Sequence, residues 1–224
     1  MTSATTLLDI KVIDDRIASE SYVPIDLSVS NKDLDTVNLD DANNFGDYIN
    51  NYLSTLNATA AFGGYNEQRN LYRSSAIFGS DSSEERNIHI GLDIWVSEGT
   101  PVLAALEGKV HSFANNIGKG NYGPTIILEH QLDQIVFYTL YGHLSLESLL
   151  TLNVGDHFAH SQKIGTLGSA DVNGGYPPHL HFQVIRDIAD KRGDYPGVCS
   201  KNELEYYLNN CPDPNLLLKL KTYK

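Results

Sequence analysis

The stretch HIGLDIWV, residues 89–96, alternates apolar and polar side chains. On an extended strand the apolar side chains share one face: Ile90, Leu92, Ile94 and Val96. His89 and Asp93 then share the opposite face, and Gly91 between them leaves room for a bound ion and its water. A helix would also align residues four apart, but the glycine and the β-branched neighbours favour a strand. The stretch therefore predicts a strand with two types of metal ligand on its free face.

The stretch PHLHFQVI, residues 178–185, has the same period of two, and its apolar face consists of Leu180, Phe182 and Val184. His179 and His181 point to the same side, roughly 7 Å apart along the strand. Both could bind one ion only with adjustment, so one ligand and one catalytic neighbour are expected. The spacing alone leaves open which histidine takes which role.

A third alternating stretch, QIVFYTLYGHL at residues 134–144, ends at His143 beside Gly142. This position suits the rim of an active site. An H-x-H pair or an H-x3-D pair taken alone is common in chains that bind no metal. Three histidine-bearing stretches, each with a free polar face, together favour a metal site.

The chemistry that such residues permit is hydrolysis. Zinc held by three protein ligands keeps a fourth position for water and lowers the pKa of that water toward about 7. A neutral histidine nearby can take the proton of the water, and a histidine that carries an N–H can stabilise an oxyanion. His143 and His179 are the candidates for these two roles.

The composition of the 224 residues narrows the class of protein. With 18 glycines, 8 prolines and 13 tyrosines, the chain favours turns and strands, and we expect a mainly β fold. The formal charge of −12 repels phosphate backbones and anionic membrane surfaces, so nucleic acid is not expected as a partner. The chain has no run of about 18 apolar residues, so no membrane span is expected.

Charged residues interrupt the first twenty positions, where a secretory signal would need a continuous apolar region. A cytoplasmic location is therefore expected for the sequence as given. A periplasmic or secreted location is the alternative if a leader was removed.

Three parts of the chain differ in pattern. Residues 1–60 are expected to form an N-terminal extension with one amphipathic helix, which the three- and four-residue spacing predicts from Phe45, Tyr48, Ile49, Tyr52, Leu53 and Leu56. Residues 61–190 form the β domain, and residues 191–224 form a C-terminal helical extension. In that extension Ser200 and Glu203 make a capping box ahead of a short helix. Two reduced cysteines there, Cys199 and Cys211, are favoured over a bridge.

Between about Asn87 and Ile185 the chain resembles the lysostaphin-type, or LytM-like, zinc endopeptidases. HIGLD at 89–93 looks like the H-x-G-x-D metal motif of that family, YGHLS at 141–145 like its Y-x-H-L-S segment, and HLHF at 179–182 like its terminal H-x-H. Further stretches resemble its core strands: GTPVLAA at 99–105, GKV at 108–110 and GPTIILEH at 123–130. The loop at 168–178 lacks the Ser/Thr-Gly pattern usual before the H-x-H pair.

The resemblance implies one Zn²⁺ per chain, with ligands His89, Asp93 and His181. It assigns His143 and His179 as the general base and the stabiliser of the transition state. It also implies a largely antiparallel sheet crossed by a substrate groove. The expected substrate is a peptide, most naturally a stem or cross-bridge peptide of peptidoglycan.

Two other functions remain open. The stretch GGYNEQRNLYR, residues 63–73, resembles a subgroup that occurs without export signals, so an intracellular zinc peptidase or amidase of the same mechanism is one alternative. The other is a non-catalytic LytM-like binding module, against which the five intact site residues argue. A cupin is disfavoured because its signature needs a glutamate a few residues after the H-x-H pair, where this chain has Gln183, Val184, Ile185 and Arg186.

Several polar residues are not expected in the site. Arg69, Tyr72 and Arg73 could bind a substrate carboxylate, but pairing at the surface is the expectation for them. The remaining histidines are expected in the core or in solvent rather than as ligands: His111, His130, His157 and His160.

Overall fold

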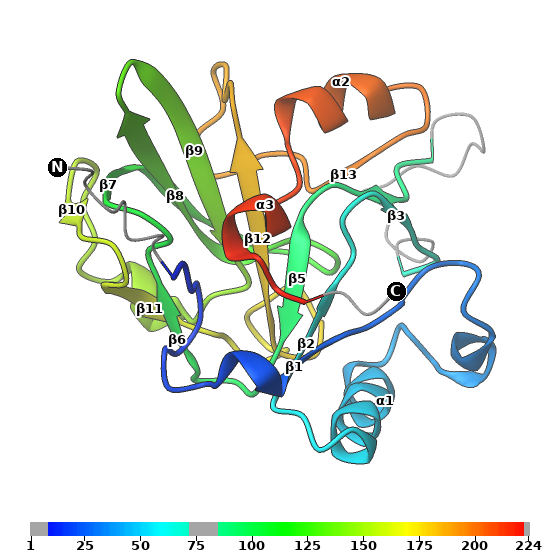
Figure 1. Ribbon diagram of the computed structural model, residues 1–224. Helices are drawn as coiled ribbons and strands as arrows, with labels where there is room; N and C mark the ends of the chain where they lie inside the picture. Colours follow the sequence, from blue (N-terminus) through cyan, green and yellow to red (C-terminus); the bar gives the residue numbers. More distant parts are fainter. Residues whose placement is uncertain (1–8, 72–84, 222–224) are drawn as a thin grey trace, which may run out of the picture.

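The computed structural model describes residues 9–71 and 85–221, and an eight-stranded sheet forms its centre (Figure 1). The strand order is β1-β2-β5-β12-β9-β8-β7-β10, and every neighbouring pair is antiparallel except the parallel pair β1–β2. The strands of this sheet are β1 (Tyr22–Pro24), β2 (Ala60–Gly63), β5 (Leu92–Trp95), β7 (Gly108–Asn116), β8 (Gly123–Leu132), β9 (Ile135–Gly142), β10 (His157–Phe158) and β12 (His179–Ile185). The prediction of a mainly β, largely antiparallel fold is confirmed.

In the described parts of the chain, two small sheets and three helices flank this centre. One sheet pairs β6 (Pro101–Leu103) with β11 (Lys163–Thr166), and the other joins β3 (Glu67–Gln68), β4 (Ile88–His89) and β13 (Val198–Cys199). The helices are α1 (Ala42–Thr55), α2 (Leu204–Asn210) and α3 (Asn215–Leu218). Short 3-10 turns occupy Ser19–Ser21, Lys32–Thr36 and Leu146–Leu149. Figure 1 shows α1 and α2 at opposite ends of the molecule.

The two central strands, β5 and β12, separate an apolar face from a polar one. Their alternate side chains join the largest apolar cluster: Leu92, Ile94, Leu180, Phe182 and Val184. The residues between them face the other way: Asp93, Trp95, His179, His181 and Gln183. Two smaller apolar clusters cover this second face on either side. Every chemically active residue of these strands therefore lies on the same face of the sheet.

The prediction that HIGLDIWV forms one strand is wrong. β4 ends at His89 and pairs with β3 and β13, whereas β5 begins at Leu92 and pairs with β2 and β12. Ile90 accordingly packs in a different apolar cluster from Leu92. The space beside Gly91 was expected to hold an ion and its water. It is occupied by the ring of His181, with which a methyl group at position 91 would collide. The chain therefore bends between the two residues of the H-x3-D pair.

The helix predicted within the first sixty residues is α1. Asp41 caps its first turn by accepting hydrogen bonds from the backbone N–H groups of Asn43 and Asn44. Phe45 and Ile49 are its buried residues, one helical turn apart. Their burial holds α1 against the end of β2 and β5.

In the C-terminal part Ser200 and Glu203 contact each other as predicted, but they do not cap the helix, because the N-cap of α2 is Glu203 and no side chain accepts from the first turn. The hydroxyl of Ser200 donates to the carboxylate of Glu203 at 2.9 Å, directly before α2. No helix in the described parts of the chain has the length and apolarity that a bilayer crossing needs. The division into residues 1–60, 61–190 and 191–224 stays a prediction.

Candidate active site

The register of the sheet creates two adjacent rows of side chains across β2, β5 and β12. In one row Asp93 lies between Gly63 and His181, and Gly142 follows next to His181. In the other row Trp95 lies between Ala61 and His179. Cross-strand neighbours on one face lie about 5 Å apart, so these rows bring a carboxylate and two imidazoles together.

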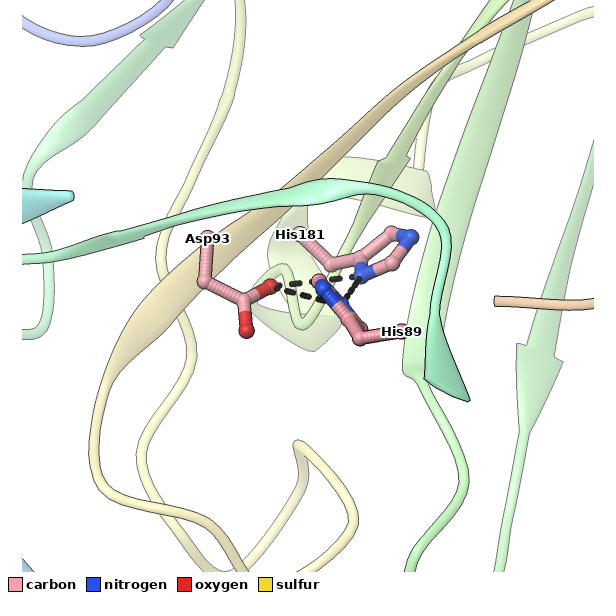
Figure 2. Close-up of side chains that lie close together, drawn as sticks. All are labelled: His89, Asp93 and His181. Carbon is pink, nitrogen blue, oxygen red and sulfur yellow. Dashed lines mark hydrogen bonds and ion pairs between the residues drawn. The ribbon is translucent and has the colours of Figure 1, made fainter. Parts of the chain in front are cut away.

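His89, Asp93 and His181 converge on one point (Figure 2). Oδ1 of Asp93 lies 3.3 Å from Nε2 of His89 and 3.2 Å from Nδ1 of His181, and the two nitrogens are 2.9 Å apart. All three side chains are buried, each 2% exposed as a residue. The structure thus brings together the three residues expected as metal ligands, although β4 and β5 belong to different sheets.

The outer ring nitrogens of His89 and His181 have acceptors that fix the tautomers. Nδ1 of His89 donates to the carbonyl of Gly64 at 3.0 Å, and Nε2 of His181 donates to Oε1 of Gln183 at 3.0 Å. The amide of Gln183 is itself oriented, because its nitrogen donates to the carbonyl of Pro196. In the neutral rings the inner nitrogens, Nε2 of His89 and Nδ1 of His181, therefore carry lone pairs.

A metal cation suits the three inner atoms of His89, Asp93 and His181 better than a proton does. Burial is the main cause that lowers the pKa of His89 to about 4, so its ring is neutral near pH 7. Among the described residues Oδ1 of Asp93 has no hydrogen-bond partner, although it is buried. Two nitrogen lone pairs and one carboxylate oxygen face each other without a donor between them. Such a donor set fits Zn²⁺, and related divalent ions of imidazole and carboxylate sites.

Arg69 supports Asp93 from behind, and sequence reasoning missed it. Its Nη1 donates to Oδ2 of Asp93 at 2.6 Å, and its Nε donates to Glu67 at 2.6 Å. Surface pairing was expected, but Arg69 is 2% exposed, so that expectation is wrong. Burial alone would raise the pKa of Asp93, but neighbouring charges, that of Arg69 among them, hold it well below its usual value. Tyr72 and Arg73 lie outside the described residues.

His143 and His179 lie beside this cluster of three residues, and the ring centroids of the two histidines are 4.2 Å apart. Nδ1 of His143 donates to the carbonyl of Asn173 at 2.7 Å, and Nδ1 of His179 donates to the carbonyl of Pro177 at 2.8 Å. Burial lowers the pKa of His143 well below its usual value and that of His179 to about 4. Both rings are therefore neutral near pH 7, and each Nε2 can accept a proton.

The backbone at His143 is in the left-handed region, with φ of 64°, where a residue other than glycine is uncommon. Its N–H donates to the carbonyl of Tyr122, and its carbonyl accepts from Gly168. These two bonds hold the strained residue directly after β9. The side chain is thereby turned from the strand end toward the cluster of His89, Asp93 and His181.

A cleft of about 310 Å³ opens over the site. The five expected residues line it together with the rings of Trp95, Tyr122 and Tyr176. Charged side chains from Arg86, Lys191 and Asp194 also contribute to its lining. The arrangement can therefore hold a cation, orient a peptide over it, and accept a proton beside it.

The other histidines lie away from this cleft. His130 is buried and bonds to the carbonyl of Glu107 and to Oγ1 of Thr139, as expected for a core residue. His111 bonds to Ser112 on β7. His157 is an exposed residue of the edge strand β10 rather than of a loop.

Comparison with known proteins adds an independent finding. The sequence pattern described as Peptidase family M23 matches residues 87–193. An uncharacterized lipoprotein, YgeR of Escherichia coli, is 36% identical over 94 residues, which are 42% of this chain and 33% of that protein. The DD-carboxypeptidase/endopeptidase Mpg of Neisseria meningitidis serogroup B is 34% identical over 96 residues, covering 43% of this chain and 20% of that protein.

An uncharacterized metalloprotease of Haemophilus influenzae is 34% identical over 95 residues, covering 42% of this chain and 18% of that protein. Among solved structures, the catalytic domain of lysostaphin from Staphylococcus simulans superposes with a TM-score of 0.42 at 23% identity, over 72% of this chain and 96% of that one. The chain spans a third or less of the length of these curated relatives.

Proposed function

Because residues 87–193 match the sequence pattern of Peptidase family M23, we propose that this chain is a zinc-dependent endopeptidase of that family. We further propose that its substrates are stem or cross-bridge peptides of peptidoglycan. One Zn²⁺ per chain would be held by Nε2 of His89, Oδ1 of Asp93 and Nδ1 of His181. His143 and His179 would serve as the catalytic pair.

One observation carries the metal part of this proposal. Three buried ligand atoms face a common point without a donor between them, while the outer atom of each ligand is engaged by Gly64, Arg69 or Gln183. Outer contacts of this kind orient metal ligands and fix their tautomers. An apolar or hydrogen-bonded structural core would not leave these three atoms facing each other without a proton.

The chemistry that zinc supplies when bound is the activation of water and the polarisation of a carbonyl group. The residues of the chain supply the proton transfers. Nε2 of His143 and Nε2 of His179 are both acceptors at neutral pH, so either can take the proton of the attacking water. Their rings are 4.2 Å apart, and like-charge repulsion disfavours protonation of both.

A single proton shared between the two rings would serve both halves of the reaction. The histidine that has accepted it becomes an N–H donor at Nε2. It can then stabilise the oxyanion or protonate the departing amine. The carbonyls of Asn173 and Pro177 keep both Nδ1 atoms engaged throughout, so each ring exchanges protons only at Nε2.

The proposed substrate rests on narrower support. One relative is named a DD-carboxypeptidase/endopeptidase, and a cleft of about 310 Å³ accommodates a short peptide rather than a folded domain. A peptidase or amidase that acts on a different peptide inside the cell would use the same five residues. A binding module without activity would not need the paired acceptors of His143 and His179.

Metal content and hydrolysis of the variants test the proposal. In His181→Ala both zinc and activity should be lost, whereas His143→Ala should keep zinc and lose about 100-fold or more in kcat. His157→Ala is the matched control, because that histidine is exposed on β10. Metal is measured by elemental analysis, and activity by new amines released from cell-wall fragments.

Two outcomes would contradict the proposal. Equal zinc loss in His181→Ala and His143→Ala would refute the division of roles. No amine release from any cell-wall chemotype by zinc-loaded protein would refute the peptidoglycan substrate, and release from unrelated short peptides would then support the intracellular alternative.

A further inference from the structure

The single tryptophan of the chain lies against one of the proposed catalytic histidines. Trp95 is the direct cross-strand partner of His179, and the two rings stack with centroids 4.0 Å apart and an interplanar angle of 22°. Trp95 is 1% exposed. The stack is therefore a buried contact inside the site rather than a surface contact.

This stack restrains a tilting of the His179 ring that its hydrogen bond does not prevent. The bond from Nδ1 to Pro177 fixes one ring atom, but the ring can still tilt about that point. Trp95 covers one face of the imidazole, and His143 lies at 4.2 Å from it with an interplanar angle of 37°. The direction of Nε2 is thus defined by three contacts together.

Apolar packing alone does not account for a tryptophan at this position. Among the described residues Nε1 of Trp95 has no hydrogen-bond partner although it is buried. A buried donor without a partner is destabilising, and tryptophan normally finds one. Phenylalanine would fill part of the same space without that cost. The larger indole ring offers a wider surface for stacking on an imidazole.

The N-terminal segment holds the other side of the indole. Phe45 of α1 packs edge-on against Trp95, with centroids 5.1 Å apart and an interplanar angle of 65°. Phe45 is fully buried, and both rings belong to the same apolar cluster. On the neighbouring strand the partner of Trp95 is only Ala61, which leaves space for the indole. A continuous chain of contacts therefore runs from α1 through Trp95 to His179.

We propose that Trp95 is a positioning residue that fixes the ring of His179, and that α1 takes part in this positioning through Phe45. The consequence for turnover rests on the proposed peptidase function. The consequence for the ring of His179 does not, because it can be measured without substrate. Neither residue touches the three proposed zinc ligands through its ring in any contact described above.

Two substitutions at position 95 separate stacking from space filling. Trp95→Phe keeps an aromatic face and should retain kcat within about 3-fold, whereas Trp95→Leu keeps only apolar volume and should lose about 10-fold or more. The zinc affinity should change by less than about 2-fold in both, since the ring of Trp95 contacts none of the three proposed ligands, and the loss in Trp95→Leu should appear in kcat more than in KM. A merely structural role would lower the amount of folded protein without splitting kcat from KM.

A measurement on the ring itself keeps this test independent of substrate. In zinc-loaded protein with ¹³C-labelled histidine, the Cε1 relaxation of His179 should report a rigid ring in the wild type and in Trp95→Phe. Trp95→Leu should make that ring mobile. If the wild type hydrolyses nothing, the proposed function fails while this measurement still decides the positioning role.

Phe45→Leu tests the contribution of α1, with Ile49→Ala as its matched control in the same helix and cluster. The first should increase the mobility of His179, and the second should lower stability without that effect. The proposal is overturned if the His179 ring is equally rigid in the wild type, Trp95→Leu and Phe45→Leu. Phe45→Leu also serves if Trp95→Leu does not fold.

Discussion

At the scale of single residues, the site contains a buried positive charge, that of Arg69, which the local sequence pattern does not predict. Alternation placed His89 with Asp93 and His179 with His181, because a strand orients every second side chain alike. It could not reveal that Arg69 contacts Asp93, since Arg69 directly follows β3 and Asp93 lies on β5, and these two strands belong to different sheets. The sequence held one sign of the contact between Arg69 and Glu67. The two residues are two positions apart in an extended stretch, so their side chains point to the same side.

Arg69→Met tests the value of this contact for metal binding. Loss of the guanidinium leaves Oδ2 of Asp93 buried without its partner, so the carboxylate loses its fixed orientation. Removal of a positive charge near a dication acts in the opposite direction, but outer contacts of metal ligands typically contribute 10- to 100-fold to affinity. We expect a net weakening of zinc binding by about 10-fold, measured by competition with a chelator.

Arg86→Met is the control for that experiment. Arg86 also lines the cleft, but it donates to the carbonyl of Val198 rather than to a proposed zinc ligand. Its substitution should leave the zinc affinity unchanged. Undiminished zinc affinity in Arg69→Met would show that Asp93 keeps its orientation without the arginine.

The tautomers of the histidines also could not be predicted from sequence. The nitrogen that each ring presents to the cleft is set by backbone carbonyls of Gly64, Asn173 and Pro177 and by the amide of Gln183. Backbone carbonyls are present at every position and leave no mark in the amino-acid sequence. The five candidate site residues could be named from the sequence, but their tautomers could not.

At the scale of elements, the loop at 168–178 contributes more to the site than its composition suggests. It supplies the carbonyls of Asn173 and Pro177, which fix the two proposed catalytic rings. It is anchored where Gly174 accepts a hydrogen bond from the N–H of Gly120 at 2.8 Å. Gly174 has φ of 88°, and a methyl group there would collide with the carbonyl of Asn121.

Gly174→Ala should therefore destabilise the protein and displace the carbonyl that orients His143. We expect a loss of about 3 kcal/mol or more, because backbone strain and a collision add together. Urea unfolding followed by circular dichroism measures this loss. The kcat on the proposed substrate should also fall, by about 10-fold or more, because His143, one of the two proposed proton acceptors, loses its alignment.

Gly155→Ala is the matched control. Gly155 has a similar φ of 92°, but a methyl group there meets no atom within 4 Å. Only the backbone strain remains, at about 1 kcal/mol, and activity should not change. Equal losses of stability and activity in the two variants would mean that the loop accommodates the methyl group at position 174 without displacing His143.

The pairing of strands also explains why the prediction of one strand for HIGLDIWV was wrong. Its period of two is continuous, and the period does not say which partner strand each residue meets. The strand partners change on either side of Gly91, and the ring of His181 occupies the space that a side chain at this position would need. That ring comes from a strand ninety residues later, so no local pattern contained the bend.

At the scale of the whole molecule, the antiparallel β architecture followed from the many short alternating stretches. The arrangement of distant segments did not follow from them. Val12 and Ile13 pack in the same apolar cluster as Leu218 of α3, and Tyr22 of β1 belongs to it as well. Contacts between segments so far apart in sequence depend on the complete fold.

The two cysteines give a prediction at this scale. Cys199 and Cys211 are free and fully buried, and burial raises the pKa of each thiol to about 11. Few thiolates exist at pH 8, and no reagent reaches them without unfolding. A disulfide reagent should therefore titrate no thiol rapidly in the native protein and two in denaturant. Fast reaction of the native protein would contradict the burial, and no thiols in denaturant would indicate a bridge.

The position of β2 limits how far this chain could be shortened. β2 covers the edge of β5 with backbone hydrogen bonds, and β1 in turn covers β2 (Figure 1). A fragment that began at residue 87 would keep all five site residues and lose both strands. The bare edge of β5 would then offer unpaired backbone groups to any neighbouring chain, which is how open sheet edges seed aggregation. Solubility of the shortened protein, rather than its chemistry, would be the first property to fail.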